Sequence, residues 1–441
     1  MSLTRGPALF RGLRSRPFAA LWAGQLVSRF GDTVSTIAVA WLVLELTGSA
    51  AAMGVVLAAH VVAFLVFSLA GGVLVDRLGR LPVMLASDLF RLVLTGGLAV
   101  LIATGNVGLA TVVVFAAVFG AVEAFFYPAY IAAVPELVPT GDRPSANSLQ
   151  QLSRRLASLV GPAIGAGLVA TGGTPVAFAI DAATFAASAA FIVVAMRATT
   201  TPHAGEADAG AVVAAVGVAE PLAVVPSIGP DADPAVLPPR QSPLADLRDG
   251  IRTVTGEPWL WIAIVLAGVT GITLAGPIGA GLPLLVERHL HAGVEVLGLI
   301  QAMIATGAIA AAIVLGSRPR LRHRGLLLYG AWITLALGVA ASGLPIGVPG
   351  VALAGLFIGA CGATVGLAWT NTVQDLVPPE RLGRVASIDA LGSSALEPIG
   401  FVAAGLAADA VGPAPVFFGG GLLSAAILAL ALTQRSIREL D

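Results

Sequence analysis

Long apolar segments alternate with short polar ones along most of the chain. A helix needs about 20 mainly apolar residues to cross the roughly 30 Å hydrocarbon core of a bilayer. Twelve segments meet this requirement, in two sets of six, at 18–44, 50–74, 83–104, 109–134, 148–170 and 176–196, and at 259–286, 294–315, 325–344, 350–374, 385–408 and 413–433. The pattern predicts an all-α integral membrane protein with twelve transmembrane helices.

A polar segment of different composition separates the two sets. Residues 198–257 are rich in Pro, Asp, Glu and Gly, which is typical of a flexible linker. Near its end, the stretch from Leu244 to Arg252 predicts a short amphipathic helix at the membrane surface. We therefore expect an N-terminal six-helix bundle (1–197), a cytoplasmic linker (198–257) and a C-terminal six-helix bundle (258–441).

The two sets of segments resemble each other at a nearly constant offset. Leu137-Val-Pro recurs at Leu376, and Gly161 recurs as Gly400, in both cases 239 residues later. Two parallel repeats related by an axis along the membrane normal are typical of transporters whose halves rock against each other. The repeat therefore favours a transporter over a channel or a receptor.

Composition excludes a soluble protein, and the charges predict an orientation. Of the 441 residues, 57% are hydrophobic and 11% are charged, whereas soluble domains carry about 25% charged residues. All 24 basic residues are arginines; Arg29 lies inside the first segment, Arg288 lies opposite the termini, and the other 22 lie on the side of the termini. Because positive charge favours the cytoplasm, we expect a multi-pass plasma (inner) membrane protein with cytoplasmic termini.

The loop after the second segment carries a charged motif made of Gly72, Asp76, Arg77, Gly79 and Arg80. It resembles the loop 2–3 motif of the major facilitator superfamily, G-x-x-x-D-R-x-G-R-R, although Leu replaces the second basic residue. The glycine permits close helix packing, and the aspartate can cap a neighbouring helix and pair with either arginine. The hypothesis is a gating contact that breaks when the halves rock. The alternative is a basic loop that only sets topology.

The fifth segment contains Gly161, Pro162 and Gly165. These residues resemble the G-P-x-x-G-G motif of the antiporter branch of that superfamily. The proline removes a backbone hydrogen bond and the glycines allow close packing, so a packing kink without meaning for transport direction is the alternative. The stretches SRFGDTV, FYPAYIAAVPELVP, SANSL and FAIDAATF also resemble the branch that holds macrolide-type efflux pumps and siderophore exporters. The resemblance covers both halves and implies export.

Ionisable side chains inside the apolar segments are the candidate functional residues. Such a residue at mid-bilayer costs about 2.5–3.5 kcal/mol on insertion scales, so each one suggests a function. Asp32 lies near the centre of the first segment, three residues after Arg29 on the same helical face, and Glu123 lies near the centre of the fourth. The hypothesis is that the carboxylates exchange protons or bind a cationic substrate; a static ion pair between Arg29 and Asp32 is the alternative.

Three further intramembrane residues are candidates for proton coupling or substrate binding. Asp181 lies in the outer third of the sixth segment, where the efflux pumps that the chain resembles also have an acid. Glu397 lies in the middle of the eleventh segment and His60 lies in the second. A histidine titrates near neutral pH, but a single membrane histidine also serves as a hydrogen-bonded structural residue.

Several chemistries have no support in the sequence. No G-x-x-x-x-G-K-[ST] loop for ATP phosphates and no G-x-S-x-G turn for a nucleophilic serine occurs. We therefore expect no enzyme activity, no catalytic residue, no cofactor and no metal, with the proton gradient as the energy source. The expected partners are a small-molecule substrate, protons and membrane lipid, without nucleic acid, and the expected state is a monomer.

Together these observations predict a secondary transporter that exports small amphipathic molecules in exchange for protons by alternating access. Three alternatives remain. A proton-coupled importer would have the same fold and the same intramembrane acids, and a lipid flippase would have the same helices with a lateral opening. A transport-inactive sensor or partner would keep the fold and would not need the acids.

Overall fold

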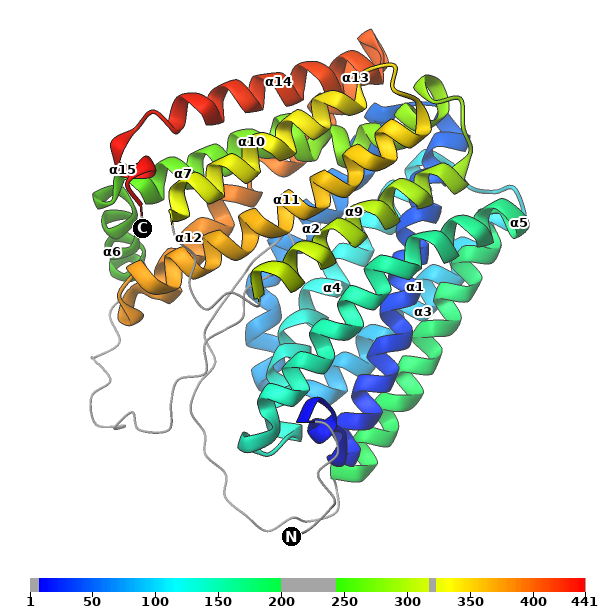
Figure 1. The fold of residues 1–441 in the computed structure, drawn as a ribbon. Helices are drawn as coiled ribbons and strands as arrows, with labels where there is room; N and C mark the ends of the chain where they lie inside the picture. The colour runs from blue at the N-terminus through cyan, green and yellow to red at the C-terminus, as the bar shows by residue number, and fades with distance from the viewer. Residues whose placement is uncertain (1–7, 200–242, 317–322, 441) are drawn as a thin grey trace.

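The computed structural model describes residues 8–199, 243–316 and 323–440, and all the secondary structure in these ranges is helical (Figure 1). The first half of the chain contains η1 (Ala8–Arg14), α1 (Arg16–Thr47), α2 (Ala50–Leu78), α3 (Arg80–Ala103), α4 (Leu109–Leu137), η2 (Thr140–Asp142) and α5 (Arg143–Thr199). The second half begins with α6 (Pro243–Gly256), α7 (Pro258–Thr270), η4 (Gly271–Ala275), η5 (Pro277–Gly281), α8 (Leu282–Leu284), η6 (Leu285–His289) and α9 (Val294–Gly316). It ends with α10 (Arg324–Ser342), α11 (Gly347–Leu376), α12 (Pro379–Ser394), α13 (Glu397–Val411), α14 (Pro413–Ala431) and α15 (Arg435–Arg438).

The long helix α5 crosses the membrane twice. Its backbone leaves the helical region at Gly173, with φ 75° and ψ 173°, a conformation that glycine adopts readily. Before this residue α5 runs parallel to α1, and after it α5 runs antiparallel to α1. The contact pairs are Trp22 with Leu149 and Val34 with Gly165 along the first arm, and Gln25 with Ser188 and Gly31 with Asp181 along the second. The chain therefore reverses at Gly173, and Figure 1 shows α5 turning back on itself.

This reversal accounts for the number of crossings. The described residues contain 11 helical segments long and apolar enough to span a membrane. One of them, Thr140–Thr199, holds 60 residues and includes both arms of α5. Eleven segments with one counted twice make twelve crossings, so the predicted all-α fold with twelve transmembrane helices is confirmed.

Two crossings of the second half are irregular. The seventh is a continuous helical segment, Pro258–His289, in which the stretches η4, η5 and η6 have wide π-helical turns. The eleventh, expected as one helix over 385–408, is broken between α12 and α13, where Pro398 occupies the first turn of α13. Proline has no N–H to continue a helix from the preceding turn, which explains the break.

Six crossings in each half place both ends of the chain on one side of the molecule. We call this the terminal side and the opposite one the distal side. The loops on the terminal side repeat, because α4 and α11 end at Leu137 and Leu376, and each is followed by Val-Pro. The α6 helix, which lies on the predicted amphipathic stretch, packs against α7 and α12 at this side.

The apolar core joins the two halves near the distal side. One cluster of buried residues contains members of both halves, and its first-half members lie toward the distal ends of their helices, such as Val43 of α1, Met53 of α2 and Phe178 of α5. Nearer the terminal side, the first half has its own cluster around Phe18, and the second half has another around Leu260. Among the described residues, the halves are therefore packed together distally and have separate cores toward the terminal side.

Helices α2 and α13 make a close contact between the halves. Gly54 of α2 lies against the carbonyl group of Phe401, and Gly405 of α13 lies against the carbonyl group of Ala50. A side chain at either glycine would collide with backbone atoms of the other helix. Glycine at these two positions therefore allows the halves to close on the distal side.

Polar groups add to this distal contact. The carboxylate of Asp409 on α13 accepts hydrogen bonds from the Ser49 hydroxyl at 2.5 Å and from the backbone N–H groups of Ala50 and Ala51 at 2.8 and 3.1 Å. Arg288 donates to the carbonyl group of Gly48 at 2.7 Å. An acidic group at a helix N-terminus is favourable because the first N–H groups have no partner within the helix.

Candidate functional site

Two of the predicted intramembrane residues form a direct pair. His60 of α2 and Glu123 of α4 lie 3.1 Å apart, measured from the ring Nε2 to the carboxylate Oε2. The helices approach closely here because Gly120, one turn before Glu123, lies against the backbone of His60. The side chains are 33% and 38% exposed. The pair is therefore accessible, and it lies midway along two membrane helices.

Asp32 and Arg29 lie near this pair on α1, but they do not form the ion pair that the sequence suggested. The guanidinium carbon of Arg29 lies 5.5 Å from the centre of the Tyr130 ring, a cation–π contact. One carboxylate oxygen of Asp32 is buried without a hydrogen-bond partner among the described residues. The alternative of a static Arg29–Asp32 pair therefore has no support in this conformation.

Asp181, which the sequence placed in the outer third of the sixth crossing, is fully buried against α1. Its Oδ1 atom accepts a hydrogen bond from the Thr184 hydroxyl at 3.3 Å, and its carboxylate also interacts with the Ser35 hydroxyl of α1. Gly31 makes the room for this acid, since any side chain there would collide with Asp181 and Thr184. Asp181 and Asp32 thus lie at the same level of α1.

Asp88 and Arg91 of α3 are intramembrane charges that sequence reasoning missed. We counted Arg91 with the basic residues of the terminal side, but it lies eleven residues into α3, about 16 Å along the helix axis. Its side chain is 4% exposed, and its Nη2 atom lies 2.6 Å from the Oδ1 atom of Asp88, which is 0% exposed. The available signal was an acid and a base three residues apart inside an apolar run.

Glu397 lies apart from this group, in the second half. It begins α13, directly after the break in the eleventh crossing. A methyl group added at Gly271 of the seventh crossing would lie 3.7 Å from its Cγ atom. Glu397 therefore faces the irregular seventh crossing, while Asp32, His60, Glu123 and Asp181 belong to the first half.

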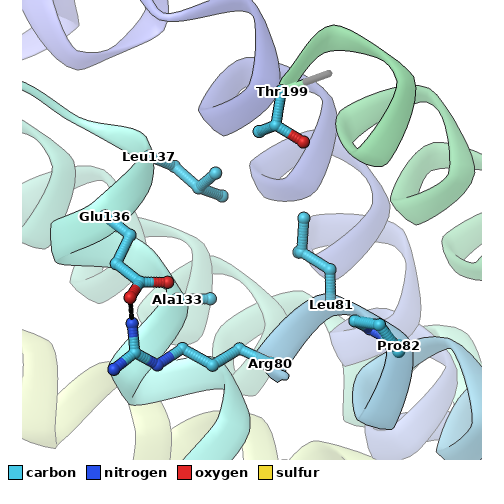
Figure 2. Close-up of a pocket in the computed structure, with 7 residues that line it drawn as sticks. All are labelled: Arg80, Leu81, Pro82, Ala133, Glu136, Leu137 and Thr199. Atoms are coloured by element: carbon cyan, nitrogen blue, oxygen red, sulfur yellow. Dashed lines mark ion pairs between the residues drawn. The ribbon is translucent and has the colours of Figure 1, made fainter. Parts of the chain in front are cut away.

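The loop motif after the second crossing is only partly described, because Gly72 and the side chain of Asp76 lie outside the part whose surroundings the structure describes. Gly79 ends α2 with φ 80°, which favours glycine. Arg77 is exposed, and Arg80 forms an ion pair with Glu136 at the end of α4 (Figure 2). Sequence reasoning missed Glu136 and proposed Asp76 as the partner of Arg80.

This ion pair borders a hollow of about 280 Å³ on the terminal side, lined also by Leu81, Pro82, Ala133, Leu137 and Thr199 (Figure 2). All of its lining residues belong to α3, α4 and α5 of the first half. The hollow lies at the helix ends, away from His60 and Glu123. Arg80 thus connects helices within one half in this conformation.

The motif of the fifth crossing lies where three helices meet. Gly161 packs against the Thr33 side chain of α1: a methyl group added at Gly161 would lie 2.6 Å from the Cβ atom of Thr33. Gly165 packs against the backbone of Val34, while the carbonyl oxygen of Pro162 would lie 2.8 Å from a methyl group added at Gly298 of α9. The motif therefore joins α1 and α5 and brings α5 against the second half.

An apolar hollow of about 490 Å³ lies between α2, α4 and α13. Its lining residues are Val55, Ala58, Ala59, Val62, Ala63, Val66 and Phe67 of α2, Ala117 of α4 and Val402 of α13. It flanks His60 along α2, and Phe67 at its edge lies 6.2 Å from the ring of Phe125. His60 and Glu123 are not part of its lining, but the lining residue Ala59 directly precedes His60 on α2. An apolar space near an accessible acid suits a ligand with an apolar body and a polar or cationic group.

The geometry does not point to a metal. Within the ranges that the structure describes, no group of three or more His, Cys, Asp or Glu side chains is arranged to hold an ion.

Comparison with known proteins gives a consistent result. The family model described as Major Facilitator Superfamily matches residues 21–396. Macrolide efflux protein A of Streptococcus pyogenes is 26% identical over 438 residues, which cover 96% of this chain and 97% of that protein. The multidrug efflux pump Tap of Mycolicibacterium fortuitum is 26% identical over 431 residues, covering 96% of each. A bacterial homologue of the iron transporter ferroportin has a similar fold, with a TM-score of 0.66 at 14% identity, over 95% of this chain and 99% of that one.

Proposed function

The chain belongs to the major facilitator superfamily, and on that premise we propose that it exports small amphipathic molecules of the drug, macrolide or siderophore kind in exchange for protons. Membership makes it a multi-pass membrane transporter of small molecules and not an enzyme. The names of its efflux-pump relatives support export of a drug or macrolide. Exchange for protons and the residues that perform it are our own inference from the site.

The observation that carries this proposal is the accessible Glu123–His60 pair beside an apolar hollow. An anionic group in the membrane is unfavourable unless it is used or neutralised. In our proposal Glu123 holds either a proton or the cationic part of a substrate, and Asp32 is the second acid that can hold a proton. Competition between proton and substrate for one carboxylate is sufficient to couple their movements in opposite directions.

Alternating access follows from the uneven contact between the halves. We propose that 1–197 and 258–441 move as two bodies about the site, while 198–257 connects them. If the arginine-rich terminal side is cytoplasmic, the separate cores there correspond to a state open to the cytoplasm. The contacts of Asp409 and Arg288 then close the outer side and must break for export.

In the proposed cycle, Glu123 loses its proton to water on the cytoplasmic side and binds the substrate. The halves then rock, the contacts around Gly54 and Gly405 separate, and the site opens outward. A proton from outside binds Glu123 and the substrate leaves. The return of the protonated site to the cytoplasm completes one exchange.

A lipid flippase is a second candidate because the hollow between α2, α4 and α13 is lined by apolar side chains alone. Such a surface also suits an acyl chain. The two functions differ in the substrate that depends on Glu123, since a neutral lipid tail needs no carboxylate.

The test is accumulation of dyes, macrolides and siderophores in a pump-deficient bacterium that expresses this chain. We expect lower accumulation of at least one compound, abolished by a protonophore and by either Asp32→Asn or Glu123→Gln. The matched control is Asp375→Asn, which removes a carboxylate paired with Arg324 at 2.8 Å at the terminal side and should leave export unchanged. Higher accumulation would indicate import. Unchanged accumulation with the protein in the membrane would contradict drug export, and labelled-lipid movement in vesicles would then test the flippase.

A further inference from the structure

The first half contains a buried polar seam that the proposed function uses only in part. Three helices contribute to it. Its members are Gln25, Ser28 and Ser35 of α1, Ser87, Asp88, Arg91 and Thr95 of α3, and Asp181 and Ser188 of the second arm of α5, all of them buried. Apart from the adjacent residues Ser87 and Asp88, successive members on each helix are three, four or seven residues apart, which places them on one face. Apolar residues would suffice to pack these helices, so the seam calls for a functional explanation.

The only ion pair among the described members of the seam, Asp88–Arg91, is incompletely hydrogen-bonded. Asp88 uses its Oδ1 atom to accept from Arg91, and its carboxylate also interacts with the Ser188 hydroxyl of α5, while the Nε atom of Arg91 has no hydrogen-bond partner in the described residues. A guanidinium carries five N–H donors in a planar fork. Arg91 therefore keeps donors available for a second carboxylate, and Asp88 does not hold it in a two-bond geometry.

Aromatic rings surround Arg91 on its other sides. Its guanidinium carbon lies 4.2 Å from the centre of the Phe126 ring, 4.7 Å from that of Phe185 and 5.9 Å from that of Phe119. Ring faces attract a cation without fixing the direction of its N–H bonds. The rings thus stabilise the buried charge and leave its hydrogen-bond partner open to exchange.

Further carboxylates lie on the helices around this guanidinium. Asp32 has one buried oxygen without a hydrogen-bond partner in the described chain, Asp181 is held only by the hydroxyl groups of Ser35 and Thr184 among the described residues, and both acids interact electrostatically with Arg91. The other charged or titratable groups that interact with this cluster or with one another near it are Arg29 of α1, His60 of α2, Glu123, Tyr127 and Tyr130 of α4, and Arg154 of α5. Of these, Arg29 contacts Tyr130 and His60 contacts Glu123.

We propose that Arg91 is the positioning residue of the proton-coupling step. Its guanidinium stays with Asp88 while Asp32 and Asp181 carry protons, and it turns toward these two acids when they lose them. This inference rests on the proposed exchange of substrate for protons. Each acid releases its proton to water and becomes a carboxylate, whereas the guanidinium keeps its protons throughout.

The exchange of partners would transmit protonation to helix packing. In one state the carboxylate partner of Arg91 is on α3 itself, because Asp88 is on the same helix. In the other it links α3 to α1 and to the second arm of α5. Loss of a proton would therefore tighten the seam across three helices, which gives the first half two arrangements that differ in proton content.

The experiment measures the pH midpoint of erythromycin binding to the purified full chain in detergent, with proton release followed by a pH indicator. Arg91→Met removes the cation that stabilises the carboxylates, so we expect its midpoint to move up by about one pH unit or more. Asp88→Asn removes the competing partner of Arg91, so we expect its midpoint to move down. Arg91→Lys keeps the charge and should lie between Arg91→Met and the wild type.

Two variants separate this role from simple packing. The double variant Asp88→Asn with Arg91→Met buries no unpaired ion and tests the idea even if a single variant misfolds. We expect it to keep the raised midpoint of Arg91→Met, whereas a purely structural pair would return it to the wild-type value. The control is Arg11→Met, which removes the cation of a surface pair with Asp142 at 3.2 Å and should leave the midpoint unchanged.

The outcomes distinguish this inference from the proposed function. Shifts in opposite directions for Asp88→Asn and Arg91→Met support the exchange of partners. Shifts in the same direction, or a wild-type midpoint in the double variant, overturn it while proton coupling stands. Erythromycin binding by the wild type that releases no proton at any pH contradicts proton coupling itself, and this inference with it.

Discussion

Removal of the Asp409 carboxylate should open the distal side of the molecule. This side chain accepts three hydrogen bonds from the first residues of α2, at 2.5, 2.8 and 3.1 Å. Asp409 belongs to the second half, and it contacts the N-terminus of α2 in the first half. Its contacts therefore exist only while the halves are closed on the distal side. In Asp409→Ala the closed state loses these contacts, and the open state, in which water replaces them, loses little.

The magnitude follows from what such contacts contribute elsewhere. A side-chain cap at a helix N-terminus contributes about 1 kcal/mol, and an anion near the helix dipole adds about 0.3–1 kcal/mol. Asp409 is exposed, so solvent screening favours the lower end of both values. A total of about 1.4 kcal/mol corresponds to a tenfold change in the ratio of distally open to distally closed molecules.

The assay is electron–electron distance measurement between two spin labels in lipid nanodiscs. The only cysteine of the chain, Cys361, is first replaced by Ala, and labels are attached at Asn106→Cys and Ile346→Cys, in distal loops of the two halves. We expect Asp409→Ala to increase the population at long distance relative to that at short distance by about tenfold.

The control removes an equivalent carboxylate that does not connect the halves. Asp142 pairs with Arg11 inside the first half, on the terminal side, so Asp142→Ala should leave the distal distances unchanged. The reasoning is refuted if Asp409→Ala gives the same distance distribution as the parent chain. A shift of equal size in Asp142→Ala would also refute it, because a general loss of charge would then be the cause.

Two further predictions concern packing in the second half. Gly359→Ala places a methyl group against the carbonyl of Ile304 and should destabilise the protein by about 1–3 kcal/mol. The control, Gly97→Ala, adds a methyl group that meets no atom within 4 Å and should leave the melting temperature in detergent unchanged. Equal melting temperatures of the two variants would count against the close approach of α9 and α11. Trp369→Phe removes the indole N–H that donates to Asp389 at 2.7 Å and should lower the free energy of unfolding by about 1–3 kcal/mol. The double variant Trp369→Phe with Asp389→Asn should recover part of that stability. No recovery would show that the ring, rather than its hydrogen bond, stabilises the contact.

The span pattern was readable from the chain because the requirement for a membrane helix is local. Each crossing needs only a sufficient run of apolar residues, and the reversal at Gly173 lies within the polar gap expected between 148–170 and 176–196. The break in the eleventh crossing was less visible. Pro398 favours a break in the helix. Whether a membrane helix continues through a proline depends on the neighbouring helices that hydrogen-bond the backbone groups left without a partner.

The candidate site could be predicted only in part from the sequence, because single charged groups can be recognised locally whereas their positions along the helices depend on the helix boundaries. Asp32, Glu123 and Asp181 stand out because an acid in an apolar run is unfavourable, whatever lies around it. Arg91 was assigned to the terminal side because its distance from the helix start was underestimated, and helix boundaries from sequence are uncertain by a few residues.

The sequence by itself determined the number of crossings, the internal repeat, the side of most of the arginines and four of the intramembrane acids, Asp32, Glu123, Asp181 and Glu397, but not Asp88. These properties depend on composition over one helix length and on transfer of single groups into hydrocarbon. Only the tertiary structure decided which groups meet: Glu123 with His60, Arg80 with Glu136, Arg29 with Tyr130, and Asp409 with the start of α2. The partners are far apart in the chain, and their meeting depends on the rotation and approach of whole helices, which residues distributed over all of them set together.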